Sequence, residues 1–198
     1  PNAIRVTVKN LTLKNANITA VNDGSNNAYA GGFIGRAYGT NVVENCTLEN
    51  SIVQGINKVG GIAGFQAENG ISIRKCTVKG STIKVDTENQ EYGQCGGILG
   101  YIGSVAAANE VSGNFIINTK VEAPANTNIG EEHRKSSICV GTLQGVKGQS
   151  LVIDMPFSYI QSSTFNGKAI DKTEYMGLLG GIRYEETQPS LTINGTRF

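Results

Sequence analysis

Apolar and polar residues alternate in short runs that recur along the whole chain. The clearest runs are Asn-Cys-Thr-Leu-Glu-Asn-Ser at residues 45–51 and Lys-Cys-Thr-Val-Lys-Gly-Ser at residues 75–81. Because successive side chains of a strand point to opposite faces, this period of two predicts β-strands with one buried face. Aligned on this phrase, six copies share an apolar or small first position: Leu11, Cys46, Cys76, Phe115, Ser158 and Leu191.

Two further apolar columns follow within each copy. The position two residues later holds Leu13, Leu48, Val78, Ile117, Ile160 and Ile193. The position seven residues after the first holds Ile18, Val53, Ile83, Glu122, Phe165 and Phe198. Only Glu122 breaks this column, and a slip of one residue would place Val121 there instead. One apolar side chain per copy in each column indicates a structural unit repeated along an axis.

A glycine motif alternates with this phrase. It reads Gly-Gly-x-x-Gly at residues 31–35, 60–64 and 96–100, and degraded copies begin at Gly141 and Met176. We interpret it as a strand whose flanking inward positions stay small, so that neighbouring backbone can approach closely. A tight turn inside the first phrase carries Asn or Gly in most copies, and these residues tolerate the positive φ of a sharp corner.

These patterns predict an all-β fold, a right-handed parallel β-helix (β-solenoid) of five to six coils with variable corner loops. Each coil would contain three or four short strands, and its loops can vary because a corner can bulge outward with little loss of packing. The right-handed sense follows from the usual handedness of parallel crossovers. No linker interrupts the repeats, so residues 1–198 are expected to form a single domain. Exposed strand edges at both ends predict that the chain is a fragment of a longer exported protein.

Composition supports this fold and narrows the range of partners. The 198 residues include 26 glycines, four prolines and no tryptophan. The 17 basic and 16 acidic residues are scattered and give a net charge of +1, so the sequence does not favour nucleic acid or an anionic membrane as partner. No stretch approaches the length of a membrane span, and no signal peptide is recognisable.

The four cysteines are expected to be core residues rather than ligands. Cys46 and Cys76 fall in one column, so they should stack in neighbouring coils as buried thiols. Stacked side chains of a parallel ladder point the same way, which is poor geometry for a disulfide. Cys95 and Cys139 each precede a glycine motif and can be core thiols too; the redox state of all four stays open. Their spacing fits no zinc motif, so we expect no metal and no cofactor.

Candidates for catalysis are confined to loops. His133 stands in the polar insert of residues 126–137 without a nucleophile motif, and we interpret it as a solvated residue rather than a general base. Acidic residues of the loops that lead into glycine motifs can gather along one lateral edge: Asp23, Asp86, Glu88, Glu91, Glu131, Glu132, Asp171 and Glu174. Asp23 and Asp86 would lie two coils apart, about 10 Å. That separation is loose for a shared calcium ion or a retaining pair of carboxylates, so we predict no catalytic residue.

Two polar patterns have structural explanations. Asn-x-Ser/Thr triplets, which can accept glycans in a eukaryotic secretory pathway, occur at Asn10, Asn17, Asn45 and Asn194. Asn10 and Asn45 recur at one repeat position, and a corner role explains that recurrence without a sugar. A threonine column, Thr12, Thr47, Thr77 and Thr192, is expected to face outward, with interruptions at Ile116 and Tyr159. Ranks broken in this way do not favour an ice-binding surface.

Aromatic residues follow the glycine motif within a few positions: Tyr38, Phe65, Tyr101 and Tyr184. Placed on one corner, they would form a row of amphipathic rings that can stack on sugar rings or anchor a protein partner. We therefore predict Tyr38, Tyr101 and Tyr184 as ligand-binding residues and assign Phe65 to the edge of the core.

The alternation of Gly-Gly-[Phe/Ile/Leu]-x-Gly with Asn-Cys-Thr-[Leu/Val]-x-[Asn/Gly]-Ser-x-[Ile/Val] resembles the GLUG-type repeats of bacterial adhesin-like and surface proteins, most clearly over residues 30–101. The resemblance implies export, a β-helix-like fold and an adhesive or extracellular binding role. It brings no catalytic residues.

We therefore expect a non-catalytic extracellular module of a bacterial surface protein, located outside the cell or on its surface, that recognises glycan or protein through lateral loops. It would bind no nucleic acid and insert into no membrane, and its oligomeric state is open. The alternative is a polysaccharide lyase or hydrolase on a β-helix scaffold, and a third reading is a structural stalk with no ligand.

Overall fold

The computed structural model describes residues 5–21, 27–85, 93–103, 109–123, 135–144, 152–154, 159–161, 164–167, 175–183 and 190–192. Within these ranges the regular structure is entirely β-strand, and the strands pair in parallel with their equivalents in the next repeat. The all-β class and the parallel stacking predicted from the sequence are therefore confirmed.

Each of the first three repeats contains five strands in the same order. The first comprises β1 (Thr7–Lys9), β2 (Thr12–Lys14), β3 (Asn17–Thr19), β4 (Ala30–Gly31) and β5 (Ile34–Ala37). The second comprises β6 (Asn41–Glu44), β7 (Thr47–Glu49), β8 (Ile52–Gly55), β9 (Lys58–Gly60) and β10 (Ala63–Gln66). The third comprises β11 (Ile71–Arg74), β12 (Thr77–Lys79), β13 (Thr82–Val85), β14 (Gln94–Gly96) and β15 (Leu99–Ile102).

The later repeats continue this order over the residues described. The fourth contains β16 (Asn109–Ser112), β17 (Phe115–Ile117), β18 (Lys120–Ala123) and the long β19 (Lys135–Gln144). It is followed by β20 (Val152–Asp154), β21 (Tyr159–Gln161), β22 (Thr164–Gly167), β23 (Tyr175–Arg183) and β24 (Ser190–Thr192).

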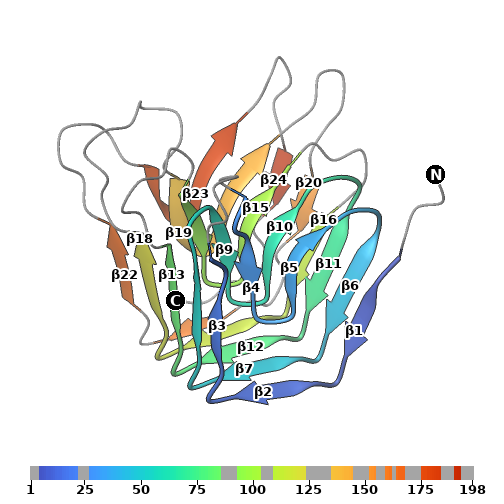
Figure 1. Ribbon diagram of the computed structural model, residues 1–198. Coiled ribbons are helices and arrows are strands. Elements are labelled where there is room, and N and C mark those ends of the chain that lie inside the picture. Colours follow the sequence, from blue (N-terminus) through green and yellow to red (C-terminus); the bar gives the residue numbers. More distant parts are fainter. Residues whose placement is uncertain are drawn as a thin grey trace.

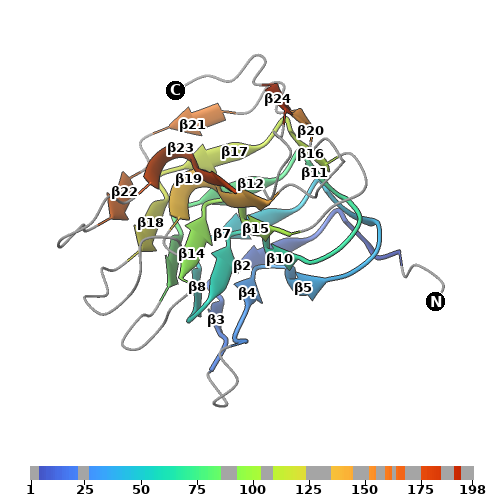
Figure 2. The same cartoon turned by 90° about the horizontal axis from the view of Figure 1, so that it is seen from above.

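Four sheets run along the stack (Figure 1). Sheet A contains β1-β6-β11-β16-β20-β24, sheet B contains β2-β7-β12-β17-β21, and sheet C contains β3-β8-β13-β18-β22. Sheets A and C form two walls that sheet B joins at the bottom of Figure 1. Viewed from above, the strands of sheet B succeed one another from β2 to β21 (Figure 2).

Sheet D lies between the two walls and has two arms (Figure 1). The first arm contains β4, β9 and β14, and the second contains β5, β10 and β15. Both arms pair with β19, which in turn pairs with β23. The glycine motif is the bend between the arms rather than a single strand, and this bend gives five strands per repeat instead of the three or four expected.

The small residues of the motif let the two arms approach each other. A Cβ on Gly60 would lie 1.9 Å from the carbonyl oxygen of Ala63, and a Cβ on Gly64 would lie 2.6 Å from the carbonyl oxygen of Ala30. The bend also reaches toward sheet B, since a Cβ on Gly32 would lie 3.3 Å from Cδ1 of Leu48. The close backbone approach expected for this motif is confirmed.

One degraded copy of the motif was aligned wrongly. Leu99 pairs with Val140 and Tyr101 with Thr142, which places Gly141 opposite Gly100, the last glycine of the motif. The position of Gly96 is taken by Ser137 and then by Gly177. The ladder between β19 and β23 shifts register between Ser137 and Val140. An irregularity of this kind removes the fixed spacing on which a sequence alignment depends.

Apolar residues lie in register along sheets B and C. In sheet B the register aligns Leu13, Leu48, Val78, Ile116 and Ile160. In sheet C it aligns Ile18, Val53, Ile83, Val121 and Phe165. Val121 rather than Glu122 therefore faces inward, as the one-residue slip suggested. Leu48, Val53, Val78 and Ile83 are fully buried, so these columns form the core between the sheets.

Three alignments of the apolar phrase need correction. Ile116, not Ile117, pairs with Val78, and Leu191 pairs with Ile153 in sheet A rather than with sheet B. In the fourth repeat the column of Cys46 and Cys76 continues with Asn114, because Phe115 pairs with Thr77. Asn114 is buried, its Oδ1 accepts from the amide of Cys76 at 2.9 Å, and its Nδ2 donates to the carbonyl of Ile73 at 2.9 Å. Ile193 and Phe198 lie outside the described residues.

Two columns of residues with positive φ make the corners of the stack. Between sheets A and B they are Asn10 (φ 58°), Asn45 (53°), Lys75 (55°) and Gly113 (59°). Between sheets B and C they are Asn15 (53°), Asn50 (48°), Gly80 (57°) and Asn118 (47°). The amide Nδ2 of Asn45 donates to Oδ1 of Asn10 at 2.8 Å across the repeats. The corner role predicted for these asparagines is confirmed.

Replacing Lys75 with Asn is expected to raise the free energy of unfolding by about 1 kcal/mol. Lys75 is exposed and holds a left-handed conformation that lysine disfavours, and its neighbours in the column are Asn45 and Gly113. Denaturant unfolding of the two proteins measures the change. Lys84→Asn is the control, because Lys84 lies within strand β13 and has no positive φ. A gain as large in the control would show that the corner conformation is not the cause.

Candidate functional site

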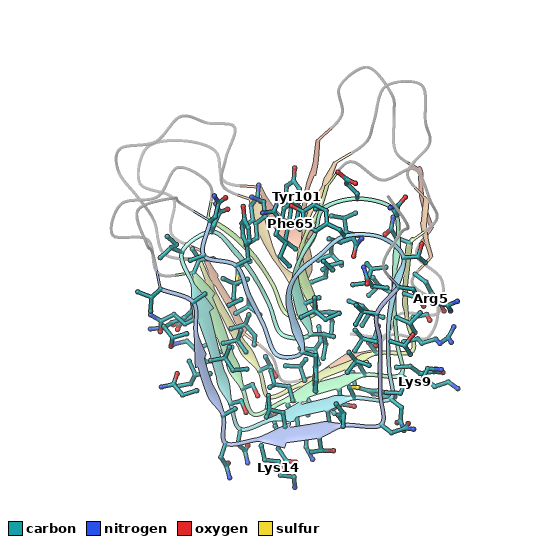
Figure 3. The ribbon with its side chains drawn as sticks, turned by 45° about the vertical axis from the view of Figure 1, so that its right-hand side comes forward. Arg5, Lys9, Lys14, Phe65 and Tyr101 are labelled. Carbon is teal, nitrogen blue, oxygen red and sulfur yellow. The ribbon has the colours of Figure 1, made fainter. Side chains whose placement is uncertain are left out.

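Six residues form an aromatic–cation cluster on the arms of sheet D: Tyr29, Arg36, Tyr38, Lys58, Phe65 and Tyr101. They lie at the ends of the arms away from the glycine bend, where Figure 3 shows Phe65 and Tyr101. Lys58 begins β9, and Phe65 and Tyr101 stand near the ends of β10 and β15. The cluster therefore collects side chains from both arms and from three successive repeats.

The register of sheet D places these residues on neighbouring rungs. Phe65 pairs with Arg36 on one side and with Tyr101 on the other. On the first arm, Ala30 pairs with Val59, so Tyr29 precedes its strand at the position that Lys58 holds in the next repeat. Lys58 pairs in turn with Gln94. One arm thus presents Arg36, Phe65 and Tyr101, and the other presents Tyr29 and Lys58.

The rings of Tyr29, Phe65 and Tyr101 pack on one another, Phe65 and Tyr101 edge to face and Tyr29 and Phe65 at a tilt. The ring centroids of Tyr29 and Phe65 are 5.2 Å apart with an interplanar angle of 60°, and those of Phe65 and Tyr101 are 5.3 Å apart at 75°. These arrangements place the positive edge of one ring near the negative face of the next, which is a favourable aromatic contact. The packing fixes the ring orientations before any ligand is present.

Two cations lie over these rings. The guanidinium carbon of Arg36 is 4.7 Å from the ring centroid of Tyr38 and 5.3 Å from those of Tyr29 and Phe65. The ammonium of Lys58 is 5.0 Å from the centroids of Phe65 and Tyr101 and 5.1 Å from that of Tyr29. Both separations fall within the range of cation–π attraction. The Lys58 ammonium also donates to Oδ1 of Asn57 at 3.0 Å.

Lys58 is held as a cation at an energetic cost. Burial, and then repulsion from Arg36, lower its pKa from the ordinary 10.5 to about 8. Among the described residues, no acidic side chain forms an ion pair with Lys58 or Arg36. Ring faces compensate only part of the hydration that a buried ammonium loses. Over the described residues, the cluster is therefore a partly desolvated surface that carries two positive charges.

Replacing Lys58 with Met should remove a pH dependence of stability. The folded pKa of about 8 lies below the unfolded value, so the unfolded chain binds more protons between about pH 8 and pH 10.5. Wild-type stability relative to Lys58→Met should therefore rise through that window, by roughly 1 to 3 kcal/mol in all. Raised pKa values of Cys76 (about 12) and Cys95 lower stability at high pH in both proteins, and the subtraction removes them.

The measurement is denaturant unfolding of both proteins from pH 7 to pH 10. Lys84→Met is the matched control, because Lys84 lies in β13 on sheet C, away from the cluster. If Lys84→Met loses the rise as Lys58→Met does, or if Lys58→Met keeps it, the dependence does not come from Lys58.

The predicted ligand-binding residues have different surroundings. Tyr38 is 48% exposed and contacts Arg36, whereas Tyr101 is only 6% exposed and packs on Phe65. Tyr184 lies outside the described residues. In the first repeat the rung of Phe65 and Tyr101 holds Arg36, so Tyr38 lies two residues beyond it. The structure thus brings Tyr38 and Tyr101 into one cluster, but only Tyr38 presents a large ring surface to solvent.

Sequence reasoning missed Tyr29, Arg36 and Lys58. The signal was present, because Tyr29 and Lys58 each stand two residues before the first glycine of a motif, in consecutive repeats. A second column, two residues before the motif, would have paired an aromatic residue with a cation. The second arm folds back onto the first and brings Arg36 and Phe65 to Tyr29 and Lys58. No sequence signal marks this arrangement.

The thiols behave as core residues. Cys46, Cys76 and Cys95 are fully buried, as predicted, and Cys46 and Cys76 are free thiols. Burial raises the pKa of the Cys76 thiol to about 12, which makes its thiolate form scarce at neutral pH. The structure does not describe the side chain of Cys139. Over the residues that it does describe, no group of three or more His, Cys, Asp and Glu could hold a metal ion.

The catalytic candidates lie almost wholly outside the described residues. His133 and the loop acids Asp23, Asp86, Glu88, Glu91, Glu131, Glu132, Asp171 and Glu174 are not placed.

Charged residues form ion pairs within sheet A and within sheet B. Glu44 forms ion pairs with Lys9 at 2.8 Å and with Arg74 at 3.1 Å, and hydrogen bonds from these two lower its pKa to about 2. Glu49 forms ion pairs with Lys14 at 3.0 Å and with Lys79 at 3.3 Å. These alternating charges are satisfied within their sheets, so they indicate structure rather than a binding site.

The outward threonine column is confirmed only in part. Thr12, Thr47 and Thr77 lie in register on sheet B, and Phe115 and Tyr159 follow them. The interruption expected at Ile116 was wrong, since Ile116 faces inward and is buried. Thr192 pairs with Asp154 in sheet A and does not belong to the column.

The family model of the GLUG motif matches residues 26–53. The matched segment contains both arms of sheet D in the first repeat, then β6, β7 and the start of β8. It therefore covers one passage through all four sheets. No curated protein and no solved structure matches the chain. Within the described part of the chain, we find no helix of the length and hydropathy needed to cross a membrane.

Proposed function

We propose that this chain, which carries the GLUG motif found in surface and secreted proteins of bacteria, is a non-catalytic extracellular binding module of a bacterial surface protein and recognises a glycan. The observation that carries the proposal is the aromatic–cation cluster on sheet D. We also propose that the fold is a right-handed β-solenoid of five to six coils and that residues 1–198 form one domain.

The cluster is suited to binding because its groups are already in position. Phe65 and Tyr101 are held by edge-to-face contacts, and Arg36 is held over the ring of Tyr38. Rigid aromatic residues lose little conformational entropy when they bind a partner. Tyr38 offers an exposed ring on which the C–H face of a sugar can stack, and Arg36 and Lys58 offer N–H donors for its oxygens.

The size of the cluster favours a glycan over a protein. Three successive rungs extend about 10 Å along the stack. A stable protein–protein interface buries about 800 Å² on each partner. A surface of this extent fits a few sugar units better than a protein epitope. An acidic edge that cleaves polysaccharide has no support from the described residues, and a lyase or hydrolase therefore enters only as an outcome of the test.

A glycan array combined with a turnover assay on the bound polymers tests the proposal. We expect binding without cleavage, and we expect Tyr38→Ala to weaken binding at least tenfold. Phe115→Ala is the matched control, because Phe115 is a similarly exposed aromatic residue, at 41%, but lies on sheet B. Cleavage of a bound polymer would favour the enzyme. Absence of any glycan binding, or equal loss in both variants, would contradict the proposed site.

A further inference from the structure

We propose that the glycan is a linear acidic polysaccharide whose carboxylates contact Arg36 and Lys58, with the polymer running along the stack over the arms of sheet D. This inference rests on the proposed function and names the class of ligand for the same cluster.

Arg36 and Lys58 differ from the cations that form ion pairs along the stack. Lys9, Lys14, Lys79 and Arg74 each lie within 3.3 Å of a glutamate in a neighbouring repeat. Lys75 and Lys84 form no ion pair among the described residues either, but Arg36 and Lys58 alone share the same aromatic rings, those of Tyr29 and Phe65. Among the described residues, the cluster therefore brings together two positive charges with no acidic side chain paired to them.

A bound anion would stabilise the charged form of Lys58. The ammonium is half-buried and is repelled by Arg36, as its lowered pKa reflects. A carboxylate placed between the two cations would offset both the lost hydration and the repulsion. A neutral sugar can accept hydrogen bonds from the same groups but leaves the repulsion in place. The cluster therefore discriminates for an acidic ligand by charge.

The geometry of Arg36 also favours a carboxylate. Its guanidinium lies over Tyr38 and within 5.3 Å of the centroids of Tyr29 and Phe65, so its orientation is fixed by three rings. A guanidinium fork fixed in this way can bind a carboxylate through two parallel hydrogen bonds. The planar guanidinium matches the planar carboxylate, and a lysine at this position would lack the two parallel donors.

The cluster also extends along the stack. On the second arm the register places Arg36, Phe65 and Tyr101 on three successive rungs, about 10 Å along the axis. Lys58 lies on the other arm, with its ammonium 5.0 Å from the ring centroids of Phe65 and Tyr101. A linear polymer aligned with the stack can contact groups on all three rungs, which favours a polymer over a single acidic sugar.

The experiment compares polymers by calorimetry and affinity electrophoresis. The probes are polygalacturonate, a sulfated glucan, a neutral glucan and poly-glutamate, each at 20 mM and 300 mM NaCl. We expect polygalacturonate to bind best, and binding to weaken at least tenfold at the higher salt because the exposed part of the attraction is screened. Arg36→Met and Lys58→Met should each weaken binding at least tenfold at low salt.

The controls separate this inference from the proposed function. Lys84→Met, on sheet C, should bind as wild type does. Lys58→Met should be at least as stable as wild type, so its lost binding cannot come from unfolding. Equal binding of the neutral glucan, or full binding by both cation variants, would overturn the inference and leave the proposed function standing. A preference for the sulfated glucan or for poly-glutamate would overturn the assignment of a carboxylated sugar. Failure of every glycan would overturn both proposals.

Discussion

The Gly60→Ala variant is expected not to reach the native fold at 25 °C. A Cβ at this position would lie 1.9 Å from the carbonyl oxygen of Ala63 and 2.7 Å from the amide nitrogen of Gly100. Both neighbours are backbone atoms, so no side chain can rotate away. The backbone itself cannot shift easily, because Gly60 pairs with Gly31 in one repeat and Gly96 in the other. We expect a loss of more than about 4 kcal/mol, at the extreme of single substitutions.

Circular dichroism and denaturant unfolding measure this loss. Gly113→Asn is the matched control, because Gly113 has a positive φ of 59° at the corner column where Asn10 and Asn45 already stand. A Cβ there meets nothing closer than 3.8 Å. The control should stay within about 0.5 kcal/mol of wild type, as surface substitutions usually do. A well-folded Gly60→Ala protein would show that the two arms of sheet D do not approach as closely as described.

The Leu48→Ala variant is expected to lose about 3 kcal/mol of stability. Leu48 is fully buried between Leu13 and Val78 in the inward column of sheet B. It also fills the space beside the bend of sheet D, where a Cβ on Gly32 would lie 3.3 Å from its Cδ1. Truncation therefore leaves a cavity between two sheets that their ladders prevent from closing. A chain of this length should melt roughly 6–12 °C lower.

Thermal and denaturant unfolding test this value. Ile52→Ala is the control, because Ile52 begins β8, the strand after that of Leu48, and is 42% exposed. It should cost less than about 1 kcal/mol, since little apolar area returns to water. Equal losses in the two variants would mean that Leu48 is not at the centre of the core.

Much of the fold could be predicted because each repeat obeys local rules. Alternation identifies the strands of sheets B and C, and the columns of Leu48 and Val53 follow from it. The corners follow from Asn and Gly, which adopt the positive φ observed at Asn45 and Gly80. These are properties of short segments, and repetition makes them visible without any knowledge of distant contacts.

The errors occurred where a distant contact replaced a local preference. Asn114 occupies the column of the cysteines because it bonds to Cys76 and Ile73 of the previous repeat, so a search for an apolar residue chose Phe115 instead. Ser51 and Ser81 show the same effect at the next corner. Both are buried, and the Ser81 hydroxyl accepts from the amide of Ser51 at 3.1 Å. A polar residue satisfied by the neighbouring repeat carries no hydrophobic signal.

The candidate site was harder to predict from the sequence than the fold. Tyr38 and Tyr101 were found because they follow the glycine motif, but the cluster depends on how the two arms of sheet D fold together. That arrangement places Lys58 of one arm within 5.0 Å of the ring centroids of Phe65 and Tyr101 on the other. The glycine motif was interpreted as one continuous strand. In a straight strand these residues would lie far apart, whereas the observed bend brings them together.

Methyl–methyl nuclear Overhauser effects in solution test the stacked register most directly. We expect contacts along the inward column of sheet B, from Leu13 to Leu48, from Leu48 to Val78 and from Val78 to Ile116. We expect no contact between Val78 and the methyl groups of Ile117. Contacts to Ile117 in place of Ile116, or the absence of contacts between Leu48 and Val78, would contradict a stack in which each repeat covers the equivalent residues of the one before.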